Sequence, residues 1–157
     1  MKKTFLLAVL LSLFSTVTLS AQNHSLWSIN TGVGYTASSG FSRDVGVLNL
    51  GVQRHLSTYF SLGGGTGAYY CDGVIIPVYT DVRGYYPIDD SKFSLIGIAR
   101  TGFGIHTKGK DMAFGLELLP GIGVNITDQS FLHINLGVGS YDSKTMGTIQ
   151  LSYSYRL

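Results

Sequence analysis

The most constraining feature of this sequence is an alternation of large apolar side chains with small or polar ones, repeated along almost the whole chain after residue 25. In one such segment, Leu132, Ile134, Leu136 and Val138 alternate with His133, Asn135, Gly137 and Gly139. Because successive side chains of a β-strand point to opposite faces, each segment is predicted to be a strand with one apolar and one polar face. Eight segments share this pattern, at residues 26–36, 44–56, 59–71, 74–86, 93–105, 112–126, 131–141 and 147–157.

The chemistry of the two faces decides which kind of β-protein this is. A water-soluble sandwich or barrel turns its large apolar side chains inward and its polar ones to water. Here the face opposite the apolar one is rich in Gly, Asn, Gln, His, Arg and Glu, which cannot form a hydrophobic core. The apolar face suits lipid, where an extended chain can pair all its backbone groups only by closing into a barrel. We therefore predict an all-β fold, an eight-stranded antiparallel up-and-down transmembrane β-barrel, with strands long enough for a tilted membrane crossing.

The first 21 residues have the pattern of a removable export signal. A positive head, Lys2-Lys3, precedes an apolar run that begins at Phe5, and Ala21 offers a small residue at the cleavage point. The run contains hydroxyl side chains and is shorter than the ~20 apolar residues of a membrane-spanning helix. We predict a signal peptide over residues 1–21 and an outer-membrane barrel over residues 22–157. No cysteine follows the apolar run, so we expect no lipid anchor there.

Charge and composition exclude several classes of function. Without Lys2 and Lys3, nine basic and nine acidic side chains remain, so the mature chain has no basic surface for nucleic acid. The single cysteine, Cys71, excludes a disulfide framework and a zinc site made of thiolates. We expect no cofactor, no bound metal and no set of catalytic residues.

Aromatic residues fall near the two ends of the predicted strands. Near the end that holds the chain termini we expect Trp27, Tyr59, Phe60, Tyr85, Tyr86, Phe93, Phe131, Tyr153 and Tyr155. Near the opposite end we expect Tyr35, Tyr69, Tyr70, Phe103, Phe114 and Tyr141. Amphipathic rings prefer the interface between membrane and water, so two aromatic girdles are expected around a barrel that crosses a bilayer.

Turn residues separate the segments. Asp72-Gly73 is a two-residue hairpin signal, and Pro77 would remove a ladder hydrogen bond, so we expect a bulge or bend at that point of its strand. Compact periplasmic links are expected at residues 56–58, 87–92 and 127–130, and short outer loops at 37–43, 72–73, 106–111 and 142–146.

Four charged residues share the polar face of neighbouring strands. Asp81 and Arg83 lie on the fourth predicted strand, Arg100 on the fifth and Glu117 on the sixth. Counted back from the turns, Asp81, Arg100 and Glu117 lie at similar heights. Because an unpaired charge inside a barrel would cost several kcal/mol, we predict that the four form an ion network in the lumen. The alternative is a proton or ion path, although side chains normally fill an eight-stranded interior.

Two other patterns have both a functional and a packing interpretation. The run Gly63-Gly64-Gly65-Thr66-Gly67 resembles a phosphate loop, but no helical pattern follows it, so we interpret the inward glycines as room for long side chains opposite. His55 and His133 lie on the inward face without the spacing of metal ligands, which favours hydrogen bonding over a metal site.

The C-terminal segment and the fourth predicted strand carry a family resemblance. The ladder of Ile149, Leu151, Tyr153, Tyr155 and Leu157 resembles the C-terminal assembly signal of outer-membrane barrels, and the strand from Ile76 to Arg83 fits the same family. The chain resembles the small eight-stranded outer-membrane β-barrels of Gram-negative bacteria, of the OmpX or OmpA-domain type, and most resembles the barrel-only domains common in Bacteroidetes. The resemblance implies insertion into the cell outer membrane by the barrel assembly machinery. It assigns Tyr153, Tyr155 and Leu157 to the assembly signal, with Leu157 in place of the usual Phe or Trp.

This resemblance implies no single activity, because such barrels host many. We expect a non-enzymatic integral barrel, monomeric and surrounded by outer-membrane lipids, with a structural, surface-contact or accessory role and a lumen filled by side chains. One alternative is a lipid A-modifying enzyme. Barrel enzymes of that kind have sites based on His and Ser, so a His-x-Ser motif is the feature to seek, and His133-Ile134-Asn135 lacks the Ser. The other alternative is a narrow pore or small-ligand carrier.

Overall fold

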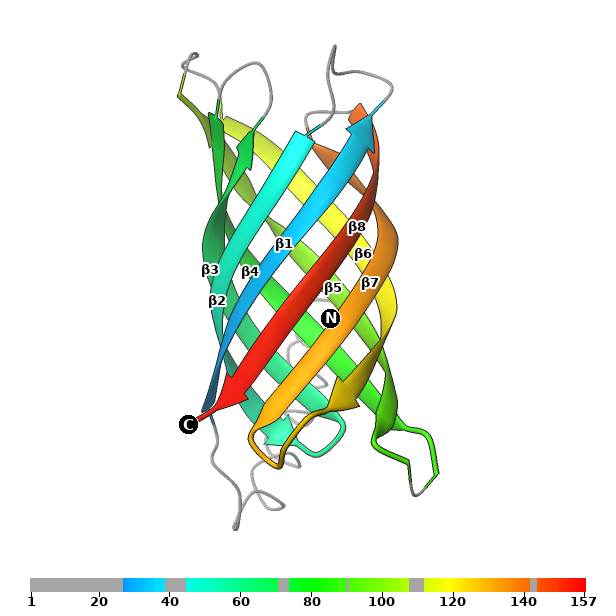
Figure 1. Cartoon of the computed structure of the whole chain (residues 1–157). Helices are drawn as coiled ribbons and strands as arrows, with labels where there is room; N and C mark the ends of the chain where they lie inside the picture. Colours follow the sequence, from blue (N-terminus) through cyan, green and yellow to red (C-terminus); the bar gives the residue numbers. More distant parts are fainter. Residues whose placement is uncertain (1–26, 39–44, 71–73, 90, 108–111, 142–143) are drawn as a thin grey trace, which may run out of the picture.

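Eight strands close into one barrel in the computed structural model of the chain (Figure 1). The structure describes residues 27–38, 45–70, 74–89, 91–107, 112–141 and 144–157. The strands are β1 (Trp27–Ser38), β2 (Val45–Ser57), β3 (Phe60–Tyr70), β4 (Val74–Pro87), β5 (Phe93–His106), β6 (Met112–Asn125), β7 (Ser130–Tyr141) and β8 (Lys144–Arg156). In these ranges no helix is long and apolar enough to cross a membrane. The predicted signal peptide and the Asp72-Gly73 hairpin lie outside the described residues.

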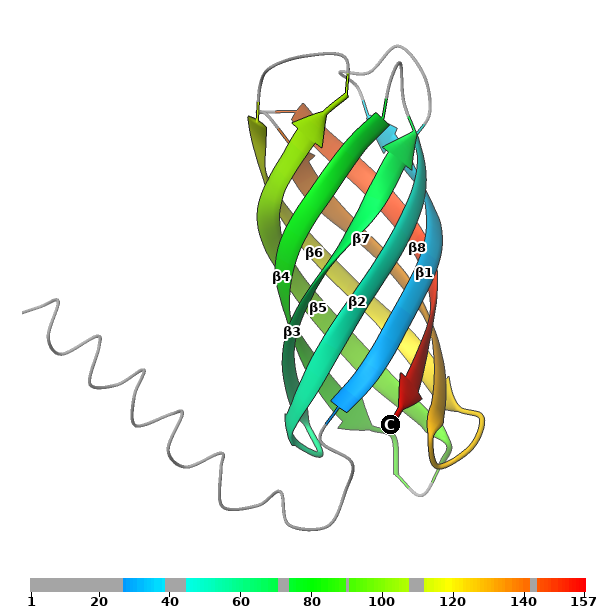
Figure 2. The ribbon, with the colours of Figure 1, turned by 90° about the vertical axis from the view of Figure 1, so that its left-hand side faces the viewer.

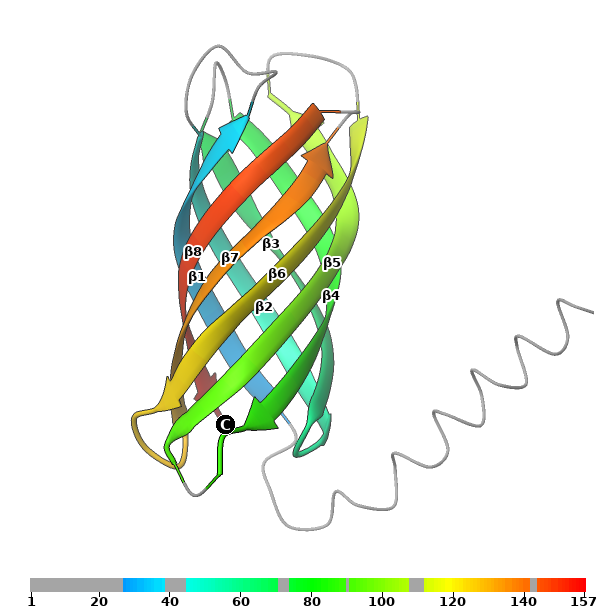
Figure 3. The same cartoon turned by 90° about the vertical axis from the view of Figure 1, so that its right-hand side faces the viewer.

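Every strand pairs antiparallel with its sequence neighbours, and β1 pairs with β8 to close the sheet (Figures 2 and 3). The predicted fold class is therefore confirmed. The backbone nitrogen of Leu157 donates to the carbonyl of Trp27 at 2.9 Å, so the first and last described residues lie side by side. We call this the terminal end of the barrel; the turns after β2, β4 and β6 lie at the same end, at the bottom of Figure 1.

Strands β1 and β8 extend further at the opposite end than the sequence pattern predicted. β8 begins at Lys144 rather than at residue 147, because Thr145 and Met146 continue the antiparallel pairing with Ser140 and Gly139 of β7. The loop expected over residues 142–146 is correspondingly shorter. β1 likewise runs to Ser38, where it pairs with β8.

The outer wall of the barrel is apolar, as the alternation predicted. Its exposed side chains include Ile29, Val33, Leu48, Leu50, Val52, Val78, Leu95, Leu116, Leu118, Ile134, Leu136, Val138, Ile149 and Leu151. Leu136 is 68% exposed and Leu50 is 55% exposed, values that a water-soluble domain would not tolerate across a continuous surface. The inward face holds Asn49, Gln53, Glu117 and Gln150, each at most 3% exposed, so the predicted reversal of polarity is confirmed.

The interior also contains two apolar clusters that the sequence reasoning missed. Val47, Tyr69, Ile75, Ala113 and Met146 pack together near the end opposite the termini. Ile96, Ile98 and Leu119 form the second cluster closer to the terminal end, with Tyr85 and Phe131 packed against it. The lumen is therefore layered, with a polar middle between two apolar clusters.

Three rings expected in the girdles point into the lumen instead. Tyr69 is 2% exposed. Tyr85 and Phe131 are partly buried against the cluster closer to the terminal end, and their rings lie edge to face with centroids 5.9 Å apart. The girdle prediction used height along the strand, whereas the parity of a residue decides its face. Tyr59 is exposed in the turn after β2, and Trp27, Tyr35 and the other described girdle rings lie on the outer wall; the side chain of Tyr141 lies outside the described part.

Pro77 interrupts the ladder between β3 and β4 as predicted, but the expected bulge is absent. It is buried on the inward face, and the pairs on either side of it, Thr66 with Val78 and Tyr69 with Ile75, keep one register. The ladder is interrupted between them, and the hydroxyl of Thr66 donates to the Pro77 carbonyl at 2.8 Å. The register shift that the structure shows in this part of the sheet lies between His55 and Ser57.

Candidate functional site: the polar network of the lumen

Strand register brings three charged side chains into one row across the lumen wall. Asp81 of β4 pairs directly with Arg100 of β5, and Arg100 pairs directly with Glu117 of β6. Directly opposed residues on one face of an antiparallel sheet have Cβ atoms ~4.5–5.5 Å apart, so their side chains meet. Arg83 lies two residues beyond Asp81 on the same inward face of β4. All four side chains are at most 3% exposed.

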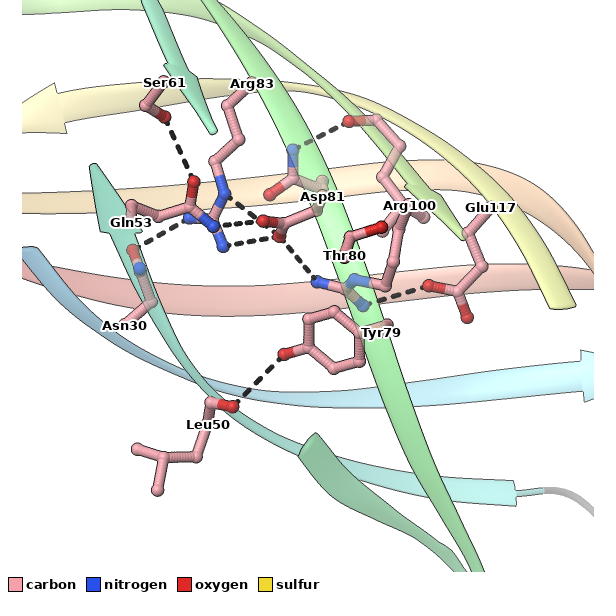
Figure 4. A network of polar contacts seen from close by, with 12 residues as sticks. Asn30, Leu50, Gln53, Ser61, Tyr79, Thr80, Asp81, Arg83, Arg100 and Glu117 are labelled. Atoms are coloured by element: carbon pink, nitrogen blue, oxygen red, sulfur yellow. Dashed lines mark hydrogen bonds and ion pairs between the residues drawn. The ribbon is translucent and has the colours of Figure 1, made fainter. Parts of the chain in front are cut away.

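The four side chains form a continuous chain of ion pairs (Figure 4). Arg83 Nη2 lies 2.9 Å from Asp81 Oδ2, and Arg100 Nη2 lies 3.7 Å from the same oxygen. Arg100 Nη1 donates to Glu117 Oε2 at 2.9 Å. Two guanidinium groups therefore face two carboxylates, and the network is neutral when all four are ionised. The structure thus brings together all four residues that the sequence singled out.

Neutral side chains of β1 and β2 add hydrogen bonds to Asp81 and Arg83. Gln53 of β2 donates through Nε2 to Asp81 Oδ1, and Ser61 of β3 donates to Gln53 Oε1 at 3.3 Å. Arg83 Nη1 donates to Asn30 Oδ1 of β1 at 2.8 Å. The bonds from Gln53 and Asn30 thus join β2 and β1 to β4, as the close-up in Figure 4 shows.

Two tyrosines close the network toward the end opposite the termini. The hydroxyl of Tyr69 donates to Glu117 Oε1 at 2.7 Å. The guanidinium carbon of Arg100 lies 4.2 Å from the centroid of the Tyr79 ring, a cation–π contact in a site closed to solvent. The Tyr79 hydroxyl donates to the carbonyl of Leu50 at 3.4 Å.

Inward glycines on β3 and β5 allow the neighbouring backbone and the side chain of Tyr79 to approach closely. A Cβ added at Gly65 would lie 2.7 Å from the Tyr79 hydroxyl oxygen, and one at Gly102 of β5 would lie 2.6 Å from the Tyr79 Cα. Both positions therefore need glycine, because a Cβ would also lie 2.2 Å from a backbone carbonyl oxygen of the neighbouring strand, that of Leu50 at Gly65 and that of Val78 at Gly102. This geometry favours the packing interpretation of Gly63–Gly67 over a phosphate loop.

A cavity of about 900 Å³ occupies the lumen at the terminal end. Its lining includes buried hydroxyls of Ser28, Ser94 and Ser154 and residues of the turns at that end. His55 also lines this cavity, and its Nε2 lies 3.1 Å from Ser28 Oγ. Nearer the middle of the barrel, the lumen is filled by the ion network and by the apolar cluster of Ile96, Ile98 and Leu119.

The inward histidines make hydrogen bonds to neighbouring polar groups. His55 contacts Ser28, and His133 Nδ1 lies 2.5 Å from Asn135 Oδ1. Across residues 27–38, 45–70, 74–89, 91–107, 112–141 and 144–157, no group of three or more His, Cys, Asp or Glu side chains is placed to hold a metal ion.

The residues assigned to the assembly signal lie on the outer wall of β8 and just beyond it. Tyr153, Tyr155 and Leu157 are 37%, 41% and 57% exposed. The Tyr153 hydroxyl lies 2.9 Å from Ser130 Oγ, and the Tyr155 hydroxyl donates to Gln129 Oε1 at 3.1 Å. Their recognition by an assembly machinery stays a prediction.

Comparison with known proteins finds similarity in fold only. No protein-family model and no curated protein sequence matches the chain. Neisserial surface protein A (NspA) aligns with a TM-score of 0.69 and 10% identity over 87% of this chain and 100% of that chain. The N-terminal β-barrel domain of Pseudomonas aeruginosa OprF aligns with a TM-score of 0.58 and 11% identity, over 85% and 100%. Ail, the attachment invasion locus protein of Yersinia pestis, aligns with a TM-score of 0.53 and 16% identity, over 83% and 96%.

These solved structures share with the chain a closed barrel that spans nearly the full length of each compared protein or domain. At such low identity the likeness concerns the path of the backbone and carries no activity with it. Together with the apolar outer wall and the polar lumen, it shows that this chain has the fold of the small eight-stranded outer-membrane β-barrels.

Proposed function

We propose that this chain is an integral outer-membrane barrel that closes its own lumen, with a structural, surface-contact or accessory role rather than transport. The observation that supports this most is the layered lumen. The neutral ion network of Asp81, Arg83, Arg100 and Glu117 fills the middle of the barrel, and the apolar cluster around Tyr69 fills the end opposite the termini. Side chains that are paired and buried leave no continuous water path for a solute.

The location and partners follow from the same chemistry. The apolar wall suits contact with outer-membrane lipids on all sides of a monomer. We infer that the terminal end faces the periplasm. The first strand begins there, the last strand ends there, and the turns after β2, β4 and β6 at that end are short, as periplasmic turns of such barrels are. Tyr153, Tyr155 and Leu157 would be read by the assembly machinery during insertion. NspA is described as a surface protein and Ail as an attachment invasion locus protein, which supports a surface-contact role for this chain as well.

The geometry gives less support to the two alternatives. A pore would require the side chains of the ion network, and those of the apolar cluster around Tyr69, to move apart. Each group is held by contacts from several strands. An enzyme acting on lipid would need its reactive groups near the lipid, whereas the Ser28–His55 pair lies inside the lumen. We therefore favour a non-enzymatic barrel.

Planar-bilayer recording and cell fractionation together test this proposal. We expect the folded mature chain to co-fractionate with the outer membrane, to migrate differently in detergent gels before and after boiling, and to give no conductance above background. A variant with Arg100, Glu117 and Met146 all replaced by Ala, which empties part of both layers, should raise the conductance if it still folds. A control with Gln129→Ala at the mouth of the terminal cavity should stay silent.

Stepwise conductance of the native chain would contradict the closed lumen. Altered lipid A, measured by mass spectrometry in cells with and without the gene, would contradict the non-enzymatic role. Recovery of the chain in the soluble periplasmic fraction would contradict the membrane location.

A further inference from the structure

A small cavity lies in the middle of the lumen, beside the ion network and separate from the large cavity at the terminal end. Its volume is about 10 Å³. Asn30 of β1, Asn49 of β2, Arg100 of β5 and Gln150 of β8 all line it. All four residues are at most 4% exposed, so bulk water does not reach them.

The polar atoms without a protein partner gather at this cavity. Among the described residues, six buried side-chain nitrogen or oxygen atoms lack a hydrogen-bond partner, and five of the six belong to these four residues. The five atoms are Asn30 Nδ2, Asn49 Nδ2, Asn49 Oδ1, Arg100 Nε and Gln150 Oε1. Buried polar groups are nearly always paired, so such a concentration around one cavity points to a bound molecule.

Two of the five atoms are fixed as donors by the bonds that their own side chains make elsewhere. Asn30 Oδ1 already accepts from Arg83 Nη1 at 2.8 Å and from the Ser154 hydroxyl, which leaves the amide nitrogen as the free group. Arg100 uses its two terminal nitrogens for Glu117 and Asp81, which leaves Nε. A ligand in the cavity must therefore accept hydrogen bonds.

The same ligand must also donate hydrogen bonds and carry no charge. Asn49 and Gln150 line the cavity and their side-chain oxygens have no donor, so an anion would meet two oxygens of like polarity. A cation would lie beside the Arg100 guanidinium, which also lines the cavity. A cavity of ~10–15 Å³ has room for one water molecule, and chloride is larger than water.

We propose that this cavity is a binding site for a single ordered water molecule. The water accepts from two of the three donors, Arg100 Nε and the amide nitrogens of Asn30 and Asn49, and donates to Asn49 Oδ1 and Gln150 Oε1. It thereby joins β1, β2 and β5 to β8 and extends the ion network to the seam where β8 meets β1. The middle layer of the lumen is then a hydrated plug that is still closed to solutes.

The test is to observe the water in the native protein by two independent methods. In nuclear magnetic resonance of the folded mature chain in detergent micelles, we expect magnetisation transfer at the water frequency to Arg100 Nε–H and to the Asn49 amide protons. In crystals grown in bromide, at a resolution that shows ordered water, we expect a water peak in the cavity and no anomalous bromide peak.

Matched variants assign the signal to this site. Asn49→Leu removes two of the five polar atoms and fills the space, so the transfer from water to Arg100 Nε–H should be lost. Thr36→Val removes a buried hydroxyl that already pairs with Thr148 at 3.0 Å outside this cavity, and it should leave the transfer unchanged. An empty cavity, an absent transfer in the native chain or a bromide peak would each overturn the proposal. If Asn49→Leu fails to fold, the native spectrum and the bromide crystal decide the question without it.

Discussion

Replacing Arg100 by methionine is the sharpest test of the ion network as a stabilising element. Met keeps much of the apolar stem of Arg and removes only the guanidinium. That group makes ion pairs with Glu117 at 2.9 Å and Asp81 at 3.7 Å and lies over the ring of Tyr79. We therefore expect Arg100→Met to destabilise the folded barrel.

The size of the effect follows from what the substitution leaves behind. Asp81 keeps Arg83 and Gln53, so its charge stays compensated. Glu117 keeps the hydrogen bond from the hydroxyl of Tyr69 but becomes a buried carboxylate that has lost its ion pair. Removing one partner of a buried ion pair costs about 3–5 kcal/mol, most of it from the charge left unpaired. We expect the free energy of unfolding to fall by about that amount.

A second substitution should return part of the loss. In the Arg100→Met background, Glu117→Gln removes the unpaired charge, and the amide oxygen can still accept from Tyr69. Since the stranded carboxylate is the main cost, we expect the double variant to be more stable than Arg100→Met by about 2 kcal/mol. Glu117→Gln alone should be destabilising, because it leaves the Arg100 charge without its nearest carboxylate.

The assay is equilibrium unfolding in lipid vesicles. Trp27 is the single tryptophan and lies 47% exposed on the outer wall, so its fluorescence reports the transfer from lipid to water. Arg54→Met is the matched control, since Arg54 lies on the outer wall with its guanidinium 5.9 Å from the Trp27 ring and should cost only ~0.5–1 kcal/mol. Because Arg54→Met changes the surroundings of the Trp27 ring, the folded fraction of that control is measured by the gel shift instead of by fluorescence. A loss below ~1 kcal/mol for Arg100→Met, or a double variant no more stable than the single one, would refute the reasoning.

Three further predictions concern the apolar outer wall, the inward glycines and Tyr69. Leu136→Arg puts a charge on the lipid face, and we expect the free energy of unfolding in vesicles to fall by about 2–4 kcal/mol. An unchanged free energy of unfolding would contradict the placement of this residue in the membrane. Gly137→Val should abolish the heat-modifiable gel band, because a Cβ there would lie 2.8 Å from the Cα of Leu119, whereas Gly147→Val, with open space around it, should keep the band. Tyr69→Phe removes the hydrogen bond to Glu117 and should cost about 1.5–3 kcal/mol in the same unfolding assay; an unchanged midpoint would remove Tyr69 from the network.

The wall and the row of charges could be predicted because two simple rules determine them. Parity fixes the face of each residue in a strand, and counting from a turn fixes its height. Asp81, Arg100 and Glu117 follow both rules, since they belong to consecutive strands joined by short connections. Their direct pairing in the structure is the outcome of that count.

The rest of the site depends on distances across the lumen, which neither rule supplies. Gln53 reaches Asp81 from two strands away, and Asn30 and Tyr69 reach Arg83 and Glu117 from three strands away. Such contacts depend on the tilt of the strands and on the length of each side chain. Parity alone would have turned Tyr69 inward, so the signal was present in the sequence and was outweighed by the expectation of a girdle.

The alternation of apolar and polar side chains and the row of buried charges together select one register of the strands out of many. A shift of one residue between neighbouring strands exchanges the faces and carries the apolar side chains into the lumen, so the alternation excludes every odd shift. A shift of two residues keeps each side chain on its own face, and lipid contact is then nearly unchanged. Such a shift between β5 and β6 would place Gly115 or Leu119 opposite Arg100 in place of Glu117 and leave both charges buried without their partner. The apolar wall therefore determines which face meets lipid, and the buried charges exclude the even shifts that the wall permits.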